Sequence, residues 1–353
     1  MIVVDGSLGE GGGQVLRTAL TLAILTREPT RIERIRAGRR TPGLRPQHLT
    51  AVQAAATICG AEVEGAELES QTLSFVPSEP ARAGTYSFDV EEAAERGSAG
   101  SVGLILQAIL LPLALSPGES HITLRGGTHV PWAPSADYLR AVFLPTVAQM
   151  GLRAELELTA WGFYPAGGGE IRVLVRGQST PLKPIELTQR GKAERIWGRG
   201  VASNLPSHIP QRMVNRARNL LSASDLKADL EALRVRGAGP GAGIFLAVEY
   251  EHALAGFTAH GRKGLPAEQV AQAVCEALLN HHRTSRPADP HLADQLILPM
   301  ALASGRSQVV TSAITGHLLT NLETVRSFLP IEARVEGEKG KPGTITITGY
   351  TDD

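Results

Sequence analysis

Residues 291–321 read HLADQLILPMALASGRSQVVTSAITGHLLTN, and the rest of the chain is organised around this stretch. A polar cluster leads directly into an apolar, helix-like run, and a Gly316-His317 pair then opens a second helical segment. A neutral imidazole can attack phosphorus near pH 7 without a separate base. Taken alone, the stretch favours a structural interpretation, in which Asp294 caps a helix and His317 lies beside a helix N-cap. The remainder of the chain decides between a nucleophilic and a structural role for His317.

The composition bounds the class of protein. A chain of 353 residues is too long for one compact core, so two domains are expected. The 35 basic and 35 acidic residues balance, which argues against broad binding to nucleic acid through excess charge but leaves room for a local basic groove. Cys59 and Cys275 have no metal-ligand spacing and read as reduced core residues. No secretory signal or membrane-spanning run is visible, so we expect a cytoplasmic protein without a membrane partner.

A glycine-rich loop follows the first predicted strand, residues 2–4, and precedes a predicted helix at residues 15–26. The loop reads LGEGGGQ over residues 8–14 and predicts a phosphate cradle, because glycine lets backbone N–H groups approach anionic oxygens. It matches neither the P-loop nor the dinucleotide pattern, and a tight structural turn is the alternative. Glu10 would repel a phosphate unless a divalent cation lay between them.

Two further loops carry unusual patterns. Residues 36–48, RAGRRTPGLRPQH, hold four arginines and a histidine without an acidic residue, which favours a fixed basic loop over a solvated charge run. Arginine side chains suit bidentate contacts with phosphate. Residues 125–134, RGGTHVPWAP, place two prolines around a tryptophan, which indicates a rigid, partly apolar wall or an ordinary structured loop.

A unit of two helices followed by strands recurs about three times, with helices expected at residues 48–59, 101–115, 137–150, 294–303 and 317–328. This rhythm predicts an α+β fold in which three helix pairs pack on one face of small sheets. Residues 184–283 read as an inserted, smaller α/β domain, with strands near 193–202, 233–236 and 244–250 and helices at 207–222 and 267–282. Residues 1–183 and 284–353 would then form the catalytic domain.

Together these segments resemble the RNA 3′-terminal phosphate cyclases. The likeness is carried by residues 5–14, DGSLGEGGGQ; by the basic loop 36–48; by Gly126-Gly-Thr and Ala133-Pro134; by residues 292–295, LADQ; and by residues 316–321, GHLLTN. Five separated motifs in the correct order cover nearly the whole chain. The resemblance implies ATP-dependent conversion of an RNA 3′-phosphate into a 2′,3′-cyclic phosphate. It also implies three repeated modules, shared with the enolpyruvyl transferases, plus the inserted domain.

The resemblance also implies roles for individual residues. His317 stands where the family carries the histidine that ATP adenylylates, and Glu10 stands where it serves a divalent metal, Mg or Mn. His291 stands where some relatives carry a tyrosine that stacks on adenine, and Asp294 would orient His317 or bind metal. The positions that line the phosphate, nucleotide and substrate site are Arg17, Arg36, Arg39, Gln47, His48, Gln107, Pro131, His291, Asp294 and Gln295.

Two other functions compete with the cyclase. One branch of the family acts in RNA processing without catalysis, but it lacks the nucleophile, whereas His317 is present here. An enolpyruvyl transferase is disfavoured by the covalent-histidine motif. The expected partner is RNA with a 3′-phosphate end, and no obligatory protein partner is evident. The insert carries none of the matched motifs, so we expect it to tune RNA handling or stability and to contribute no catalytic group.

Overall fold

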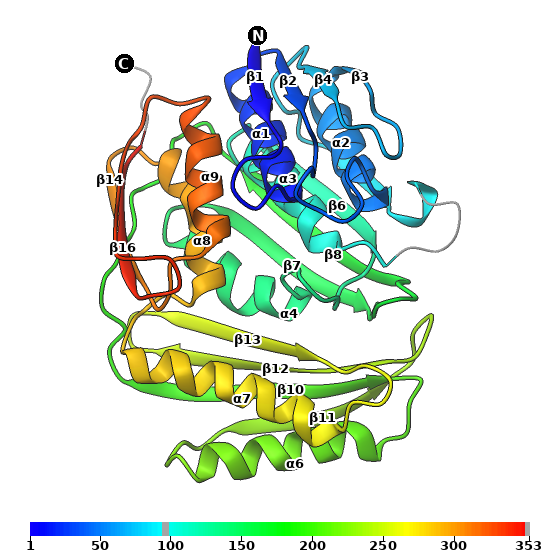
Figure 1. The fold of residues 1–353 in the computed structure, drawn as a ribbon, viewed down its shortest axis with the longest axis vertical. Helices are drawn as coiled ribbons and strands as arrows, with labels where there is room; N and C mark the ends of the chain where they lie inside the picture. The colour runs from blue at the N-terminus through cyan, green and yellow to red at the C-terminus, as the bar shows by residue number, and fades with distance from the viewer. Residues whose placement is uncertain (94–98, 350–353) are drawn as a thin grey trace.

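The computed structural model describes residues 1–93 and 99–349, and within them three modules repeat one order of elements (Figure 1). Each module contains a four-stranded sheet in which its first two strands pair in parallel and its other pairs are antiparallel. One helix joins the first strand to the second, and a second helical segment joins the second strand to the third. The strand order within each sheet is first, second, fourth, third. The predicted α+β fold of three helix-pair-on-sheet modules is therefore confirmed.

The first module consists of β1 (Ile2–Asp5), α1 (Gly13–Thr26), β2 (Thr30–Glu33), α2 (Pro46–Cys59), β3 (Glu62–Glu64) and β4 (Leu73–Val76). Helix α1 is buried over residues 15–24 because it packs against α2, α3 and α9. Helix α2 begins with Pro46, whose fixed φ suits a first helical position, and ends at Gly60 in the left-handed region. These two helices carry the glycine-rich and basic loops at their N-terminal ends.

The second module consists of β5 (Thr85–Asp89), a 3₁₀ turn η1 (Glu91–Ala93), α3 (Val102–Ala114), β6 (Gly118–Gly126), α4 (Ala136–Tyr138), η2 (Leu139–Phe143), α5 (Leu144–Ala148), β7 (Arg153–Ala160) and β8 (Gly169–Gly177). A single helix was expected at residues 137–150. The structure has one helical segment there, but its middle, η2, is a π-helical turn. Such turns insert one extra residue into the helical ladder and shift the side chains that follow.

The third module consists of β9 (Glu186–Leu187), α8 (Pro290–Ala301), β14 (Arg306–Thr311), α9 (Gly316–Arg326), β15 (Glu332–Glu336) and β16 (Gly343–Thr348). Because β9 pairs in parallel with β14, the chain enters the third sheet before it forms the insert. We propose that the insert begins after β9, and the division into two domains stays a prediction. Helix α8 is capped by Asp289, which accepts hydrogen bonds from the backbone N–H groups of His291 and Leu292. The structural interpretation of Asp294 as a cap is therefore wrong, because Asp294 lies inside α8.

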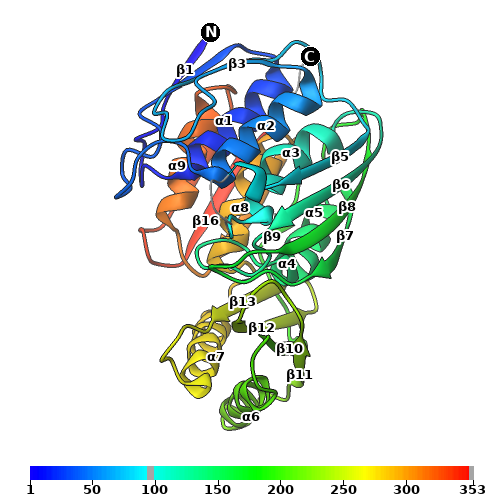
Figure 2. The ribbon, with the colours of Figure 1, turned by 90° about the vertical axis from the view of Figure 1, so that its right-hand side faces the viewer.

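The insert consists of β10 (Ala193–Ser203), α6 (His208–Ser222), β11 (Asp229–Val235), β12 (Gly241–Tyr250), β13 (Leu254–His260) and α7 (Ala267–Thr284). Its sheet has the order β11-β10-β12-β13, and α6 and α7 pack together on it. Figure 2 shows the insert as a separate lobe below the three modules, with β13 nearest to them. Strands β12 and β13 contact α4 of the second module. Strand β13 was not predicted, because Gly256 and two alanines give it low β-propensity.

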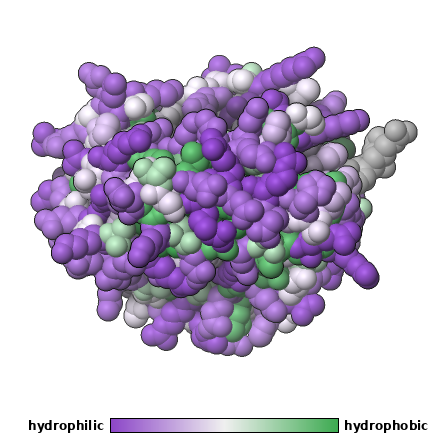
Figure 3. Space-filling view, turned by 90° about the horizontal axis from the view of Figure 1, so that it is seen from below, coloured by the Kyte–Doolittle hydropathy of each residue, from purple (hydrophilic) through white to green (hydrophobic). Residues whose placement is uncertain are grey.

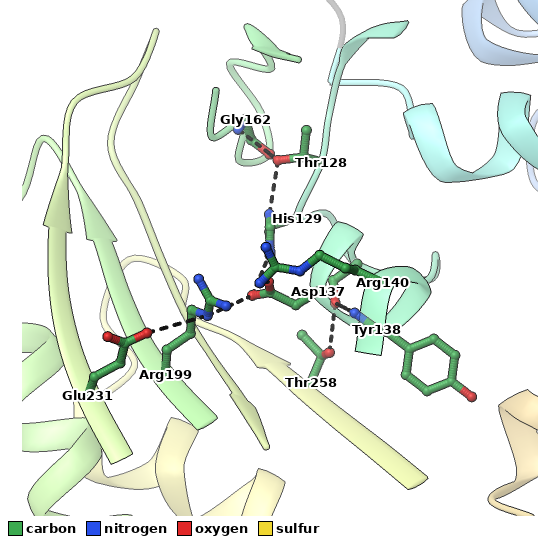
Figure 4. Close-up of polar contacts among 10 residues, drawn as sticks. Thr128, His129, Asp137, Tyr138, Arg140, Gly162, Arg199, Glu231 and Thr258 are labelled. Atoms are coloured by element: carbon green, nitrogen blue, oxygen red, sulfur yellow. Dashed lines mark hydrogen bonds and ion pairs between the residues drawn. The ribbon is translucent and has the colours of Figure 1, made fainter. Parts of the chain in front are cut away.

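A buried polar cluster joins the insert to the second module (Figure 4). Asp137, at the start of α4, lies 3.4 Å from His129 Nε2 and 3.6 Å from Arg199 Nε of β10. Burial by itself raises the pKa of Asp137, but the hydrogen bond and charge of His129 and the charges of Arg199 and Arg140 hold it below its ordinary value. The insert is therefore docked through a charged contact.

The outer surface of the insert is mostly hydrophilic. Figure 3, which views the molecule from this end, shows only small, scattered apolar areas among polar side chains. Cys59 and Cys275 are both buried and free, as expected. None of the helices in the described part of the chain is long and apolar enough to cross a membrane.

Candidate functional site

A cavity of about 620 Å³ lies where the three modules and the insert meet. This volume falls within the range of about 300–1,000 Å³ that is typical of small-molecule sites. Every site residue that the sequence suggested lines this cavity, except Pro131, whose neighbour Trp132 does. The residues of the first module that line it are Glu10, Arg17, Arg36, Arg39, Gln47 and His48. Those from the second and third modules are Gln107, His291, Asp294, Gln295 and His317. Their individual roles stay predictions.

His317 is the second residue of α9, and its side chain is in contact with that of Glu10. Its Nε2 atom lies 3.3 Å from Glu10 Oε2, and both side chains are partly exposed. The glycine before it makes this approach feasible, because a Cβ at Gly316 would lie 2.3 Å from Glu10 Oε1. The hydroxyl of Thr315 caps α9 by accepting a hydrogen bond from the backbone of Leu318. The Gly-His pair thus forms a defined helix start with an accessible imidazole.

The imidazole of His317 is favoured in its neutral form. Burial lowers its pKa, and the charges of Arg17, Arg39 and His291 lower it further, while the carboxylate of Glu10 acts in the opposite direction. The net shift is below the ordinary value of 6.5. A ring nitrogen with a free lone pair is therefore present at pH 7, as nucleophilic attack requires.

Three arginines form the cationic wall of the cavity. Burial lowers the pKa of Arg17 to about 10. Arg36 donates hydrogen bonds to the carbonyl oxygens of Thr41 and Gly43, each at 2.8 Å, which fixes the basic loop. Burial and the charges of Arg45 and Arg39 lower the pKa of Arg36. The positive charges of neighbouring guanidinium groups repel one another, and a bound anion would relieve this repulsion.

The basic loop, residues 36–48, contains no acidic residue, but the expectation that it also lacks acidic partners is wrong, because the fold brings two carboxylates to it. Arg45 pairs with Glu69 at 3.2 Å, and Arg39 lies 3.8 Å from Glu10. Both acids are remote from residues 36–48 in sequence. Among the described residues, Arg17 and Arg36 have no ion pair with a carboxylate, so both contribute uncompensated positive charge to the cavity.

The glycine-rich loop makes room for side chains of the site. A Cβ at Gly12 would lie 2.7 Å from an Arg39 nitrogen, and one at Gly13 would lie 2.4 Å from His48 Nε2. Helix α1 begins at Gly13 without a side-chain cap, and Gly13 and Gln14 line the cavity. Its free N–H groups and helix dipole therefore favour an anion there, as the predicted cradle requires.

His48 is a buried hydrogen-bond donor. Burial and the charges of Arg36, Arg17 and Arg45 hold its pKa well below 6.5, so the ring is neutral. Its Nδ1 atom accepts a hydrogen bond from the backbone N–H of Arg45 at 3.3 Å. The proton of the neutral ring is therefore assigned to Nε2, which can donate to a bound ligand.

Asp294 supports the start of α9. Its carboxylate accepts a hydrogen bond from the hydroxyl of Thr315, the residue that caps α9. Burial, followed by the charges of Asp289 and Glu10, raises the pKa of Asp294 to about 7. Its carbonyl oxygen accepts from Asn321, which in turn accepts a hydrogen bond of 2.6 Å from Thr18 of α1. This network fixes α8, α9 and α1 relative to one another behind His317.

The glutamines are held by local contacts. Gln107 Nε2 donates to Gln295 Oε1 at 3.1 Å, and Gln295 Nε2 donates to the carbonyl of His291 at 3.0 Å. Gln47 Oε1 accepts from the backbone N–H of Ser101 at 2.9 Å, at the start of α3. These contacts tie one wall of the cavity to α3 and α8.

Several cavity residues lie outside the set of site residues that the sequence suggested. The insert contributes Gly256, Thr258 and His260 from β13, so it lines the cavity although it carries none of the family motifs. The second module contributes Trp132, Ala133, Pro134, Ser135 and Tyr138. The tryptophan between two prolines was a signal for these residues, but β13 gave none.

A neutral imidazole beside clustered guanidinium groups is suited to chemistry on phosphorylated substrates. The family model described as RNA 3′-terminal phosphate cyclase matches residues 8–335, and the chain belongs to this family. The resemblance seen in the sequence is thereby confirmed.

Curated relatives agree over nearly the whole length. The RNA 3′-terminal phosphate cyclase of Trichormus variabilis is 53% identical over 93% of this chain and 94% of its own. That of Methylococcus capsulatus is 52% identical over 93% of this chain and 91% of its own. That of Desulfurococcus amylolyticus is 41% identical over 99% and 98%. A solved structure, the enolpyruvyl transferase NikO from Streptomyces tendae, matches with a TM-score of 0.39 at 12% identity, covering 99% of this chain and 48% of that one. That likeness is too weak to carry an argument.

Proposed function

We propose that this protein converts the 3′-phosphate of RNA into a 2′,3′-cyclic phosphate at the expense of ATP, with His317 as the nucleophile. The observation that carries the proposal is the neutral imidazole of His317, which faces a cavity that Arg17, Arg36 and Arg39 also line. Membership of the RNA 3′-terminal phosphate cyclase family supplies the substrate class.

The reaction has three steps. First, a ring nitrogen of His317 attacks the α-phosphorus of ATP; a P–N bond forms, the P–O bond to pyrophosphate breaks, and the ring proton leaves. Second, an oxygen of the RNA 3′-phosphate attacks the same phosphorus and displaces the imidazole, which takes up a proton as it leaves. Third, the vicinal 2′-hydroxyl attacks the RNA phosphorus, loses its proton and displaces AMP. The guanidinium groups stabilise the charge that develops on the phosphate oxygens.

A divalent cation would be held here by Glu10. Among the described residues, no three or more His, Cys, Asp and Glu side chains could hold a metal by themselves. Mg²⁺ is commonly bound by one or two carboxylates together with substrate phosphates, and Glu10 supplies one such carboxylate beside His317. A bound Mg or Mn ion would neutralise phosphate charge. A cytoplasmic location and independence of a protein partner also stay predictions.

Incubation with α-labelled ATP and Mg²⁺, without RNA, tests the first step. The wild-type protein should retain acid-labile label, and His317→Asn should retain none. His208→Asn, at an exposed histidine of α6, is the matched control and should label like the wild type. An unlabelled wild-type protein would favour the non-catalytic RNA-processing factor, and a labelled His317→Asn would place the nucleophile elsewhere.

RNA synthesised with AMP already joined to its 3′-phosphate separates the steps. His317→Asn should still cyclise this substrate, because attack by the 2′-hydroxyl needs no covalent histidine. A folded variant that binds the activated RNA without accelerating its cyclisation would mean that His317 also acts as a general acid or base.

A further inference from the structure

Trp132 is the most exposed large apolar side chain of the described residues, at 95% exposure. It lines the same cavity as His317. Its φ of 62° lies in the left-handed region, which bulky side chains rarely adopt. An unfavourable backbone conformation and an exposed apolar side chain both indicate a functional contact. Because Trp132 lines the cavity, a ligand in the cavity would make this contact.

The other two tryptophans show what the indole of Trp132 lacks. Trp161 stacks on His129 with ring centroids 4.4 Å apart. Trp197 packs edge-on against Phe245 and donates a hydrogen bond of 2.6 Å to Glu249. Trp132 has no such ring contact with any residue in the described ranges.

The loop that carries Trp132 is anchored on its C-terminal side. Ser135 Oγ accepts a hydrogen bond from the backbone N–H of Tyr138, and it lies 3.1 Å from Thr258 Oγ1 on β13. The backbone N–H of Ala136 donates to the carbonyl of Thr128 at 2.9 Å. The indole is therefore presented from a fixed loop at the boundary between the second module and the insert.

The ligand that fits a fixed, exposed indole beside a phosphate-binding wall is a nucleobase. Single-stranded RNA ends are commonly bound by stacking of unpaired bases on aromatic side chains. The cavity receives two bases in the proposed reaction, the adenine of ATP and the base next to the RNA 3′-phosphate. His291 of the third module also lines the cavity and offers a second, separate ring.

We propose that the indole of Trp132 stacks on the base of the 3′-terminal nucleotide of the RNA substrate. This inference rests on the proposed function and adds a base-binding subsite to it. The stacking is tolerant of base identity, because every base has a π-face, so Trp132 contributes affinity without selecting a sequence.

The test measures binding of a 5′-fluorescent single-stranded RNA 3′-phosphate to the full chain without ATP. Three RNAs are compared: intact, abasic at the terminal nucleotide, and abasic at the fifth nucleotide from the 3′ end. For the wild type, removal of the terminal base should weaken binding about tenfold, and removal of the fifth should change it little. Trp132→Ala should bind intact RNA about tenfold more weakly and should lose nothing further when the terminal base is absent.

Two protein controls accompany this measurement. Trp132→Phe should recover most of the affinity, because it restores an aromatic face. Tyr164→Ala removes another exposed aromatic side chain, outside the cavity lining, and should bind like the wild type. The proposal would be overturned if removal of the terminal base weakened the binding of RNA to Trp132→Ala by the same factor as its binding to the wild type.

A second measurement distinguishes RNA from ATP. The KM for ATP in protein labelling should rise by less than threefold in Trp132→Ala. A rise as large as the loss of RNA affinity would assign the indole to adenine and overturn the proposal. RNA binding is measured without turnover, so the two proposals are tested separately. A wild-type protein that is not labelled by ATP would refute the proposed cyclase reaction, and the binding measurement would still decide whether Trp132 stacks on the terminal base.

Discussion

At the scale of single residues, Asp294 shows how burial sets the properties of the site. The residue is only 6% exposed, and it lies near Asp289 and Glu10, which are also acidic. Burial and these charges raise its pKa to about 7, so the folded protein holds a proton there that an unfolded chain releases near pH 3.8. At neutral pH and above, the ionised Asp294 therefore lowers the stability of the folded protein, which is consistent with a role other than stability.

The pH dependence of stability tests this. Below pH 3.8, Asp294 is protonated in the folded and the unfolded state and does not change the free energy of unfolding. As the pH rises towards 7, it lowers that free energy increasingly, and above this pH the destabilisation is complete. Asp294→Asn removes the titration, so relative to the wild type it should gain about 2–3 kcal/mol of unfolding free energy between pH 5 and pH 8. Urea unfolding at both values measures the difference. Asp225→Asn, at an exposed aspartate, should give a curve parallel to that of the wild type; a parallel curve for Asp294→Asn would contradict the prediction.

The sequence indicated the residues of the site better than it indicated their contacts. The family resemblance that the ordered motifs carry implied a common site for Glu10, Arg39 and His317, and all three line one cavity. The pairing of Arg39 with Glu10 could not be foreseen, because it depends on how two loops 29 residues apart pack. Thr258 gave no signal, because its role depends on a strand that belongs to the insert.

At the scale of elements, the N-terminus of α8 is the point where three parts of the molecule meet. Asp289 is fully buried; it caps α8 and accepts hydrogen bonds from Tyr138 Oη at 3.0 Å and from the backbone N–H of Gly256 at 3.3 Å. It therefore joins the third module to the second module and to the insert. The Asp-Pro pair at residues 289–290 was the sequence signal for this helix start, and it was overlooked in favour of Asp294.

Replacement of Asp289 should be strongly destabilising. Asp289→Ala removes the cap, worth ~1 kcal/mol, and leaves two buried donors unsatisfied at ~1–3 kcal/mol each, so we expect a loss of about 3–7 kcal/mol. Asp289→Asn keeps one acceptor oxygen and should lose clearly less. Chemical unfolding of both variants measures the ratio, and equal losses would mean that the carboxylate charge, rather than its hydrogen bonds, holds this junction.

The elements that sequence reasoning missed are strands: β2, β3, β5, β9, β13 and β14. Strands β2 and β9 have only four and two residues, too few for an alternating pattern to stand out. Strand β14 lies within the stretch 291–321 between two helices whose periodicity dominated the interpretation. Long helices were placed to within a few residues, because their apolar spacing is local, whereas strand pairing depends on distant partners.

At the scale of the whole molecule, the insert interrupts the third module between β9 and α8, and its attachment to the second module includes a buried charged contact. Arg199 of β10 reaches Asp137 at 3.6 Å and Glu231 at 3.8 Å, and its Nε has no hydrogen-bond partner among the described residues. Asp137 is only 1% exposed. A buried carboxylate that loses one of its cationic partners is left with an uncompensated charge.

The docking of the insert can be tested by a double-mutant cycle. Arg199→Met should lower the unfolding free energy by about 1–3 kcal/mol, and the combination with Asp137→Asn should lose less than the sum of the single changes, because the uncompensated charge is gone. Arg195→Met is the control on the same strand; its exposed pair with Asp229 should be worth no more than about 1 kcal/mol. Additive losses would mean that Asp137 and Arg199 do not interact.

The contact between α1 and α9 has a consequence for synthesis of the protein on the ribosome. Thr18 and Asn321, which share a hydrogen bond, lie 303 residues apart in sequence. At translation rates of about 5–20 residues per second, α1 waits roughly 15–60 s for α9 to emerge. During that time the face of α1 that α9 covers stays open to water, so the nascent first and second modules have an uncovered helix that chaperones can bind. Glu10 is likewise made long before His317, and these two residues meet only when the third module closes.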